Sequence, residues 1–359
     1  MRELCGLPVY PDSIDSTLAL RELDALELGD GLPLVIPTEA RIDAMLDGII
    51  EPQKVHGMLP PLFGELRVDA VAYQCVLAGC EPAELDIVFA AAEACLDADF
   101  NLLGLLTTTG TAAVALVVHG AIARKLGISS DSNCLGPGAR ANACIGRALS
   151  LVLRNIAGAK QGVADMATMG QPGKYTFCFA ERDDHNFPTL PQRQNEGQNE
   201  DLARTANAIT VLGVSGTAEV LPIGGGGSAE NILAPVALAM SASVLMGGAR
   251  EREPTQQVVL LPPELIGALA GQGFGLADIQ SYLFDTANVS ALVNSTARAT
   301  TRTSAFANVQ PPGPVAASAA DIQPIQTGGP GVKMTYLPLW AGGTRPTTRP
   351  VRNLRATSD

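Results

Sequence analysis

Apolar residues along the chain fall into short runs and helical periods that predict alternating helices and strands. Residues 113–119 (AVALVVH) are β-branched and apolar, which is typical of a buried strand of a parallel sheet. Residues 139–156 have the period of a long helix, entered through Gly136-Pro-Gly138. Further helices are expected at 38–47, 68–78, 83–96, 232–246, 263–271 and 276–286, and further strands at 174–180, 208–214, 217–221, 257–261 and shortly after the glycines at 328–331.

This alternation predicts an α/β fold with a mixed sheet and flanking helices. Residues 182–204 are polar and show no hydrophobic period, so we take them as a linker or a long loop. They divide the chain into an N-terminal α/β lobe at 1–190, which holds the candidate site segments, and a C-terminal α/β lobe at 205–359. The uncharged stretch 100–123 is long enough to span a bilayer, but its threonines and His119 interrupt it, and we expect buried core.

Composition describes a globular chain and argues against two classes of partner. The chain has 359 residues, of which 47% are hydrophobic and 17% charged, enough to bury one large core or two ordinary ones. The net charge of −12 repels phosphate backbones and anionic lipid headgroups, so neither nucleic acid nor a membrane is expected as a partner. The high apolar content and the Ala-rich helices lead us to expect a homo-oligomer.

The N-terminus and the cysteines indicate a cytoplasmic protein. The first residues, MRELCGLP, hold a charge pair and a proline where a signal peptide needs an unbroken apolar stretch. The seven cysteines are odd in number and lack the spacing of a disulfide scaffold, so we expect thiols in a reducing compartment.

The strongest local signal is the segment 133–147 (NCLGPGARANACIGR), a glycine turn that leads into a helix. Free backbone N–H groups after Gly136 and Gly138, with Arg140, Asn142 and Arg147 on the first turns, would hold a carboxylate or phosphate. In the alternative, Gly-Pro-Gly only begins a helix and both arginines pair with acidic neighbours.

Two thiols, Cys75 and Cys80, stand five positions apart near the end of an expected helix. Ideal helical geometry turns them about 140° apart, which makes a disulfide within an intact helix awkward. Cys80, beside a loop, is the better candidate for a nucleophile, although a helix C-terminus would raise its pKa. Both cysteines could instead be small buried hydrophobes, or zinc ligands together with His119 or His56.

Three residues are candidates for proton transfer. Lys174 and Glu181 flank the expected strand at 174–180, and burial would shift their pKa values toward neutrality. His119 ends a strand, where α/β proteins keep their sites, and could act as a general base or as a structural histidine.

Two polar turns could contact a substrate. The hydroxyl-rich segment 107–111, with Thr108 and Thr109, could bind an oxyanion or simply form a turn. Four glycines precede Ser228, which is expected to cap the next helix. Neither a dinucleotide fingerprint nor a Walker lysine is present, so no cofactor can be assigned.

The same segments resemble a bacterial family of unsettled activity that is associated with small UGSC-motif (seleno)proteins. The resemblance rests on LAGC at 77–80, GPGARAN at 136–142, IGRA at 145–148 and PGKYTFCFAE at 172–181, and it covers about the first half of the chain. Relatives tend to have Asn-Ala where this chain has Gln74-Cys75, and Asn-Gly-Pro where it has His119-Gly-Ala. The resemblance implies a diverged member with a thiol or selenol partner protein.

These observations favour a cytoplasmic enzyme that acts on a small anionic metabolite. The segment 136–147 would bind the anion, His119 or Lys174 would move a proton, and Cys80 or Cys75 would act as a thiol nucleophile or sulfur relay. Lyase, hydratase or sulfur-transfer chemistry fits the absence of a nucleotide fingerprint. The alternatives are a non-catalytic partner subunit of a UGSC-like protein and a zinc protein using Cys75, Cys80 and His119.

Overall fold

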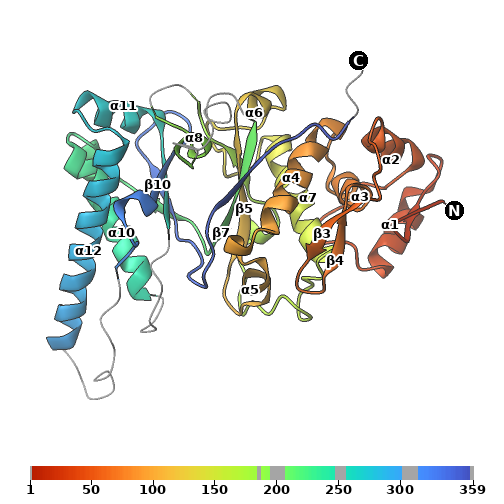
Figure 1. Ribbon diagram of the computed structural model, residues 1–359, viewed down its shortest axis with the longest axis horizontal. Coiled ribbons are helices and arrows are strands. Elements are labelled where there is room, and N and C mark those ends of the chain that lie inside the picture. The colour runs from red at the N-terminus through yellow and green to blue at the C-terminus, as the bar shows by residue number, and fades with distance from the viewer. Residues whose placement is uncertain (1, 184–186, 195–206, 247–255, 301–313, 356–359) are drawn as a thin grey trace.

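Two mixed β-sheets packed face to face form the centre of the molecule, and a layer of helices covers each outer face (Figure 1). The computed structural model describes residues 2–183, 187–194, 207–246, 256–300 and 314–355. The fold is therefore of the α/β class, as the sequence predicts, with four layers in the order helices, sheet, sheet, helices.

The first sheet has the strand order β12-β7-β5-β6. Its central strand β5 (Ala113–His119) runs parallel to β6 (Cys178–Ala180) and antiparallel to β7 (Ala208–Val214). Strand β12 (Thr347–Pro350) pairs antiparallel with the outer side of β7. Because β7 and β12 both follow residue 204, the polar segment at 182–204 does not separate one sheet from the other. Residues 184–186 and 195–204 of that segment lie outside the described residues.

Alternate residues of β5 face the two neighbouring layers. Leu116 and Val118 pack among the helices, whereas Ala115 and Val117 pack against the second sheet. Both faces of the strand are therefore buried, which explains why residues 113–119 read as a continuous apolar run.

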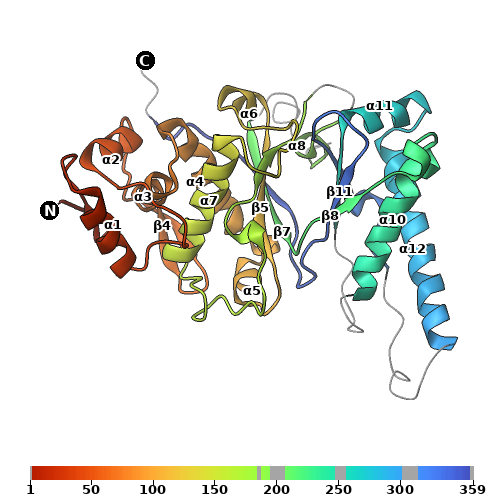
Figure 2. The ribbon, with the colours of Figure 1, turned by 180° about the vertical axis from the view of Figure 1, so that it is seen from behind.

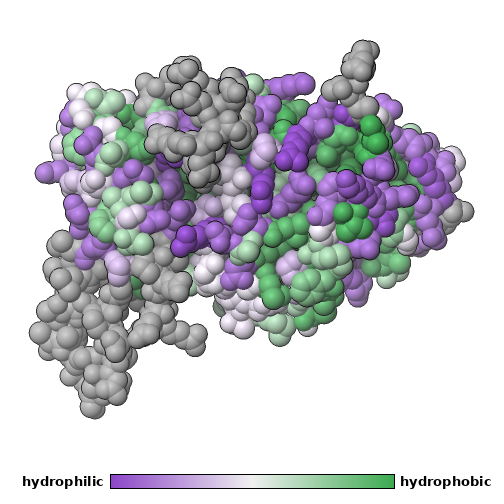
Figure 3. Space-filling model, in the orientation of Figure 1, coloured by the Kyte–Doolittle hydropathy of each residue, from purple (hydrophilic) through white to green (hydrophobic). Residues whose placement is uncertain are grey.

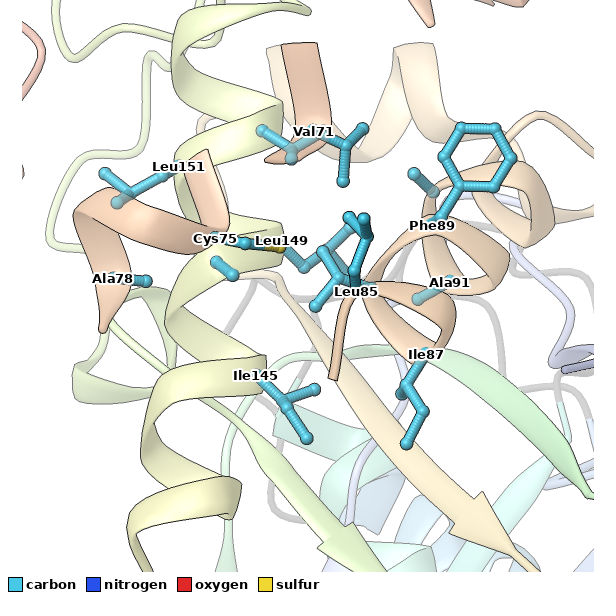
Figure 4. Close-up of a cluster of buried hydrophobic side chains, with 14 of the residues drawn as sticks. Val71, Cys75, Ala78, Leu85, Ile87, Phe89, Ala91, Ile145, Leu149 and Leu151 are labelled. Atoms are coloured by element: carbon cyan, nitrogen blue, oxygen red, sulfur yellow. The ribbon is translucent and has the colours of Figure 1, made fainter. Parts of the chain in front are cut away.

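Three helices cover the outer face of the first sheet. Helices α4 (Leu85–Cys95) and α7 (Arg140–Asn155) contact its strands, and α3 (Val68–Ala78) packs across both helices. Figure 4 shows side chains of α3, α4 and α7 meeting in this core, with Leu85 and Leu149 at its centre. The apolar stretch at 100–123, which contains α5 (Leu102–Thr107) and β5, contributes buried residues such as Phe100, Leu105 and Leu116 to the core, whereas Leu103 is exposed. In the described ranges, no helix has the length and apolar character that crossing a bilayer requires.

The second sheet has the strand order β10-β9-β11-β8. Its strands are β8 (Ala218–Val220), β9 (Gln257–Leu261), β10 (Ile322–Gln326) and β11 (Met334–Leu337). Its outer face is covered by α10 (Ala229–Met246) and α12 (Leu276–Thr300), with α11 (Pro263–Gly271) at one end of the layer (Figures 1 and 2).

The remaining elements lie mostly at the N-terminal end of the molecule. They are β1 (Arg2–Leu4), β2 (Leu7–Val9), α1 (Ser16–Ala25), α2 (Glu39–Leu46), the hairpin of β3 (Val55–Leu59) and β4 (Gly64–Arg67), and the short helices α6 (Ala121–Lys125) and α8 (Leu190–Gln194). Helix α2 begins after Thr38 and ends before Gly48, in agreement with the sequence pattern.

One expected strand is shorter than its pattern. Residues 174–180 were expected to be extended, but Pro172–Lys174 form a 3₁₀ helix and only Cys178–Ala180 pair with β5. Proline begins this turn because its fixed φ suits the first helical position.

Large apolar side chains are exposed near the β3–β4 hairpin and α5. They are Val55, Met58, Leu62, Phe63 and Leu103. Figure 3 shows a green area on this part of the surface. Such an area is consistent with the expected homo-oligomer, which stays a prediction.

Candidate functional site

A cavity of about 490 Å³ lies beside the C-terminal half of α7 and the first residues of β5. Residues of helix α5 and of the segment 159–175 complete the lining. Figure 2 shows the loop that follows α7 running near α5 at this end of the molecule. Its lining residues are Asp30, Leu105, Leu106, Ala112, Ala113, Val114, Ser150, Leu153, Arg154, Ala159, Gln161, Asp165, Ala167, Met169, Gly170, Gln171, Pro172, Lys174 and Tyr175.

Arg154 is the unpaired cation of this cavity. Arg147, Ser150 and Arg154 share one face of α7 because they are three and four positions apart. Within the described ranges Arg154 makes no ion pair, and its Nε is buried without a hydrogen-bond acceptor. A buried donor without a partner costs about 1–3 kcal/mol, so Arg154 favours an anionic ligand in the cavity.

Lys174 and Asp165 form the second charged group of the cavity. Lys174 Nζ lies 2.7 Å and 2.6 Å from the two carboxylate oxygens of Asp165. Both side chains are about one quarter exposed, so they reach solvent through the cavity. Lys174 is therefore at a cavity, as expected for a proton-transfer residue, with Asp165 as its partner.

Several other polar side chains at or beside the cavity already have partners. Arg147 donates to both oxygens of Asp30, at 2.8 Å each. Gln171 donates to the carbonyls of Thr111 and Val214, and Ser150 donates to that of Gly146. These bonds connect the segment 159–175 and α7 to the rest of the fold. In the part of the chain that the structure describes, Arg154 remains the lining cation without an ion pair.

The pKa of Asp30 follows from this pairing. Burial by itself would raise the pKa of Asp30. Hydrogen bonds from the Arg147 guanidinium and from the backbone of Leu32 lower this pKa, and together they outweigh the effect of burial. The net result is a pKa below the ordinary value, so Asp30 is ionised and neutralises Arg147.

The arginines at the start of α7 are bound to carboxylates. Arg140 donates to Glu84 Oε1 at 2.5 Å and to the carbonyl of Gly79 at 3.1 Å, and it lies 3.2 Å from Glu81. Arg147 is bound to Asp30, on the cavity side. Both arginines therefore pair with acidic neighbours, as the alternative interpretation of this segment predicted.

The remaining groups of the 136–147 segment organise the turn before α7. Asn142 accepts from Ser129 N at 2.7 Å and donates to two backbone carbonyls, those of Ser129 and Cys134. Gly136 N donates to the carbonyl of Asn133, and Gly138 has a φ of 136°. A glycine is needed at 138 because other residues rarely adopt this φ.

Cys75 and Cys80 are brought together by the end of α3. Gly79 has a φ of 85°, and its N–H donates to the carbonyl of Val76 while that of Cys80 donates to Cys75. This Schellman motif turns the chain back, so that the two thiols share a hydrogen bond. The angle of about 140° for an ideal helix does not apply, because the helix ends before Cys80.

The environment of Cys80 opposes a nucleophilic role at neutral pH. The hydrogen bond with Cys75, followed by burial, raises the pKa of the Cys80 thiol well above its ordinary value. All seven cysteines are free. In the part of the chain that the structure describes, no three His, Cys, Asp or Glu side chains are grouped to hold a metal ion, so the zinc set of Cys75, Cys80 and His119 is not assembled.

His119 and Glu181 meet in the interior at the ends of β5 and β6. His119 Nδ1 lies 2.8 Å from Glu181 Oε2, and its Nε2 lies 2.7 Å from Thr210 Oγ1. Arg193 lies 3.4 Å from the other oxygen of Glu181. His119 and Glu181 are almost fully buried, so they form an internal polar network away from the cavity, which lies at the opposite end of β5.

The two polar turns, with Thr108, Thr109 and Ser228, are not part of the cavity lining. Thr108 Oγ1 accepts from Gly110 N, and the carbonyl of Thr109 accepts from Thr168 N. Ser228 Oγ accepts from Asn231 N at the start of α10, which matches the expected capping role. Of the residues proposed from the sequence, only Lys174 and Arg147 therefore lie at or beside the cavity.

The sequence reasoning missed Arg154 and the partner role of Asp165. Two weak signals were present: the spacing of Arg147, Ser150 and Arg154 on one helical face, and a carboxylate nine positions before Lys174. No family model matches the chain, and no curated protein matches it significantly.

Proposed function

We propose that this protein is an enzyme that binds a small anionic metabolite in the cavity and transfers a proton with the Lys174–Asp165 pair. The observation that carries the proposal is Arg154, a cation without a carboxylate partner in the described ranges, in a cavity that also contains this pair. Anion binding thus moves from the start of α7, where the sequence predicted it, to the end of the same helix.

A lyase or hydratase reaction fits these groups best. Asp165 would remove the proton next to the carboxylate of a 3-hydroxy acid, and the Lys174 ammonium would protonate the leaving hydroxyl. The carbon–oxygen bond breaks, the double bond forms from the electron pair of the C–H bond, and water leaves. The proton on Asp165 then returns to Lys174 across their hydrogen bond of 2.6 Å, which restores both groups.

Sulfur transfer has less support than proton transfer. No cysteine is among the residues that line the cavity. The raised pKa of Cys80 further reduces its thiolate at neutral pH.

A second candidate function is that of a partner subunit for a UGSC-like protein. It is favoured by the thiol pair, since Cys80 is partly exposed beside the fully buried Cys75. Co-expression with a UGSC-like protein tests it: stable co-purification that is lost in Cys80→Ser supports this function, and separate elution contradicts it.

The main proposal is tested by anion binding. Titration calorimetry would measure the affinity for butanoate, octanoate, succinate and inorganic phosphate in wild type, Arg154→Gln and Arg124→Gln. Arg124 is an exposed arginine on α6, outside the cavity, and serves as the matched control. At least one anion should bind wild type and the control with equal affinity. Its affinity for Arg154→Gln should be lower by a factor of about ten or more, since a charged hydrogen bond is worth about 1.5–3 kcal/mol. Equal affinity in Arg154→Gln contradicts the proposal.

A further inference from the structure

We infer that the substrate carries one carboxylate at the end of an apolar chain of medium length. This inference rests on the proposed function and names the substrate class for the same cavity. It follows from three properties of the lining: its charge balance, its apolar wall and its volume.

The charge balance of the cavity favours a single negative charge. Lys174 is neutralised by Asp165, and Asp30 is neutralised by Arg147. Among the described residues, none pairs with Arg154, which is left as one positive charge. A second anionic group on the ligand would have to lose its hydration without a cation to pair with, which is costly.

Five lining residues form an apolar wall. Leu105 and Leu106 come from α5, Leu153 from α7, and Ala113 and Val114 from the start of β5. Leu105, Leu153 and Ala113 are buried, so they form a fixed floor against the core. A chain of methylene groups lying along this floor would leave water and gain about 0.8 kcal/mol for each group buried.

The volume of the cavity sets the size of the ligand. A water molecule takes about 30 Å³ of liquid volume, so about 490 Å³ holds on the order of ten to twenty non-hydrogen atoms. Butanoate would leave most of the apolar wall uncovered, whereas octanoate would cover it.

Chain-length dependence tests the inference. Calorimetry with butanoate, hexanoate, octanoate and octanedioate should give an affinity that rises by about fourfold for each added methylene. The heat capacity of binding should become more negative along the series, because apolar surface is buried. Octanedioate should bind at least tenfold more weakly than octanoate, because its second carboxylate would lie against the apolar wall.

A pair of variants on α5 distinguishes a change in the apolar wall from a general effect on the protein. Leu106→Asn changes a lining residue, whereas Leu103→Asn changes an exposed residue of the same helix outside the lining. Leu106→Asn should weaken octanoate about tenfold and butanoate less, and Leu103→Asn should leave both unchanged. Circular dichroism would verify that each variant is folded.

The possible failures are distinguishable. The inference is overturned if carboxylates bind through Arg154 with equal affinity at every chain length, or if octanedioate binds as tightly as octanoate. Either result leaves the anion site in place. Equal loss of octanoate affinity in Leu106→Asn and Leu103→Asn also overturns it. If no carboxylate binds the folded wild type, the proposed function and this inference are both wrong.

Discussion

Glu181 and His119 lie in contact at the ends of two adjacent parallel strands, with 2.8 Å between Oε2 and Nδ1, and neither side chain reaches solvent. Glu181 also faces Arg193, whose guanidinium is nearly buried and has its pKa lowered by that burial. The network joins β5 and β6 to α8, so it contributes to the stability of the first sheet.

Glu181→Gln should lower the free energy of unfolding by about 3 kcal/mol, because it leaves the Arg193 charge buried without a carboxylate. Urea unfolding measures the change. Glu219→Gln, in the exposed pair with Lys333, is the control and should change stability by less than about 0.5 kcal/mol. Adding Arg193→Met to Glu181→Gln should recover part of the loss; a strictly additive double variant would show that the two groups do not interact.

Lys174→Met should abolish proton transfer, which is measured at saturating substrate so that a change in ligand affinity does not enter. We expect the rate of hydration of 2-octenoate, followed by loss of its conjugated absorbance, to fall about 100-fold or more. Octanoate affinity should fall by less than the rate does, since Arg154 still holds the carboxylate although Asp165 is left without its cation. Lys333→Met, on the second sheet, should behave as wild type. If Lys174→Met retains the full rate, Lys174 is not the proton donor.

The Asp30–Arg147 pair predicts a loss of stability in acid. The pKa of Asp30 is lowered on folding, so the unfolded chain takes up its proton at a higher pH than the folded chain. The contribution is therefore fully present above the ordinary value of 3.8 and is lost as the pH falls through the lowered folded-state pKa. The difference in unfolding free energy between wild type and Asp30→Asn should be about 1–3 kcal/mol at pH 6 and shrink toward pH 3.

An exposed carboxylate provides the comparison for that experiment. Asp43→Asn removes an exposed ion pair with Arg2 and should change stability by less than about 0.5 kcal/mol at pH 6. A difference for Asp30→Asn that stays constant from pH 6 to pH 3 would mean that the pair is not titrated in this range.

Gly146 is required because α7 passes directly against the chain that enters β6. A Cβ at this position would lie 2.5 Å from Thr176 Oγ1 and 2.7 Å from the backbone nitrogen of Phe177. Gly146→Ala should therefore destabilise the protein by about 1–3 kcal/mol, measured by thermal unfolding. Gly267→Ala on α11 meets nothing within 4 Å and should stabilise it slightly, because alanine favours a helix. A stabilising Gly146→Ala would contradict this packing.

Cys80 should react slowly with iodoacetamide at pH 7.5 in the folded protein. Its pKa is raised, so its thiolate fraction is smaller than that of a free cysteine until well above pH 9. Peptide mass spectrometry after timed alkylation measures the rate, and the same chain in urea is the control. Labelling as fast in the folded as in the unfolded chain would restore Cys80 as a candidate nucleophile.

The hydrophobic pattern was sufficient to predict the strongly apolar helices and strands, but not how they assemble into two sheets. The strand at 113–119 was predicted with its exact bounds, yet nothing in its seven residues shows that a second sheet covers one face. Strand β12 was missed, because Thr347–Pro350 is short and polar and is a strand only through its pairing with β7.

The candidate site was predictable only in part, for a related reason. Lys174 stood out because it precedes an apolar strand. Arg154 looked like any charged residue on the polar face of a helix, and the cavity that it lines also needs residues of the segment 159–175, which are far from α5 and β5 in the sequence. The contact between Cys75 and Cys80 was not predicted, because a single left-handed residue, Gly79, replaces helical geometry with a reversal of the chain.

The position of β12 has a consequence for the protein during synthesis. Thr347–Pro350 leave the ribosome long after Ala208–Val214, yet they cover the free edge of β7 in the first sheet. Until residues 347–350 have emerged, the nascent chain presents the backbone of β7 as an open edge to which another chain can pair. A ribosome that stalls shortly before codon 347 would release a polypeptide with nearly all of its core but an unprotected sheet, the kind of product that chaperones must retain.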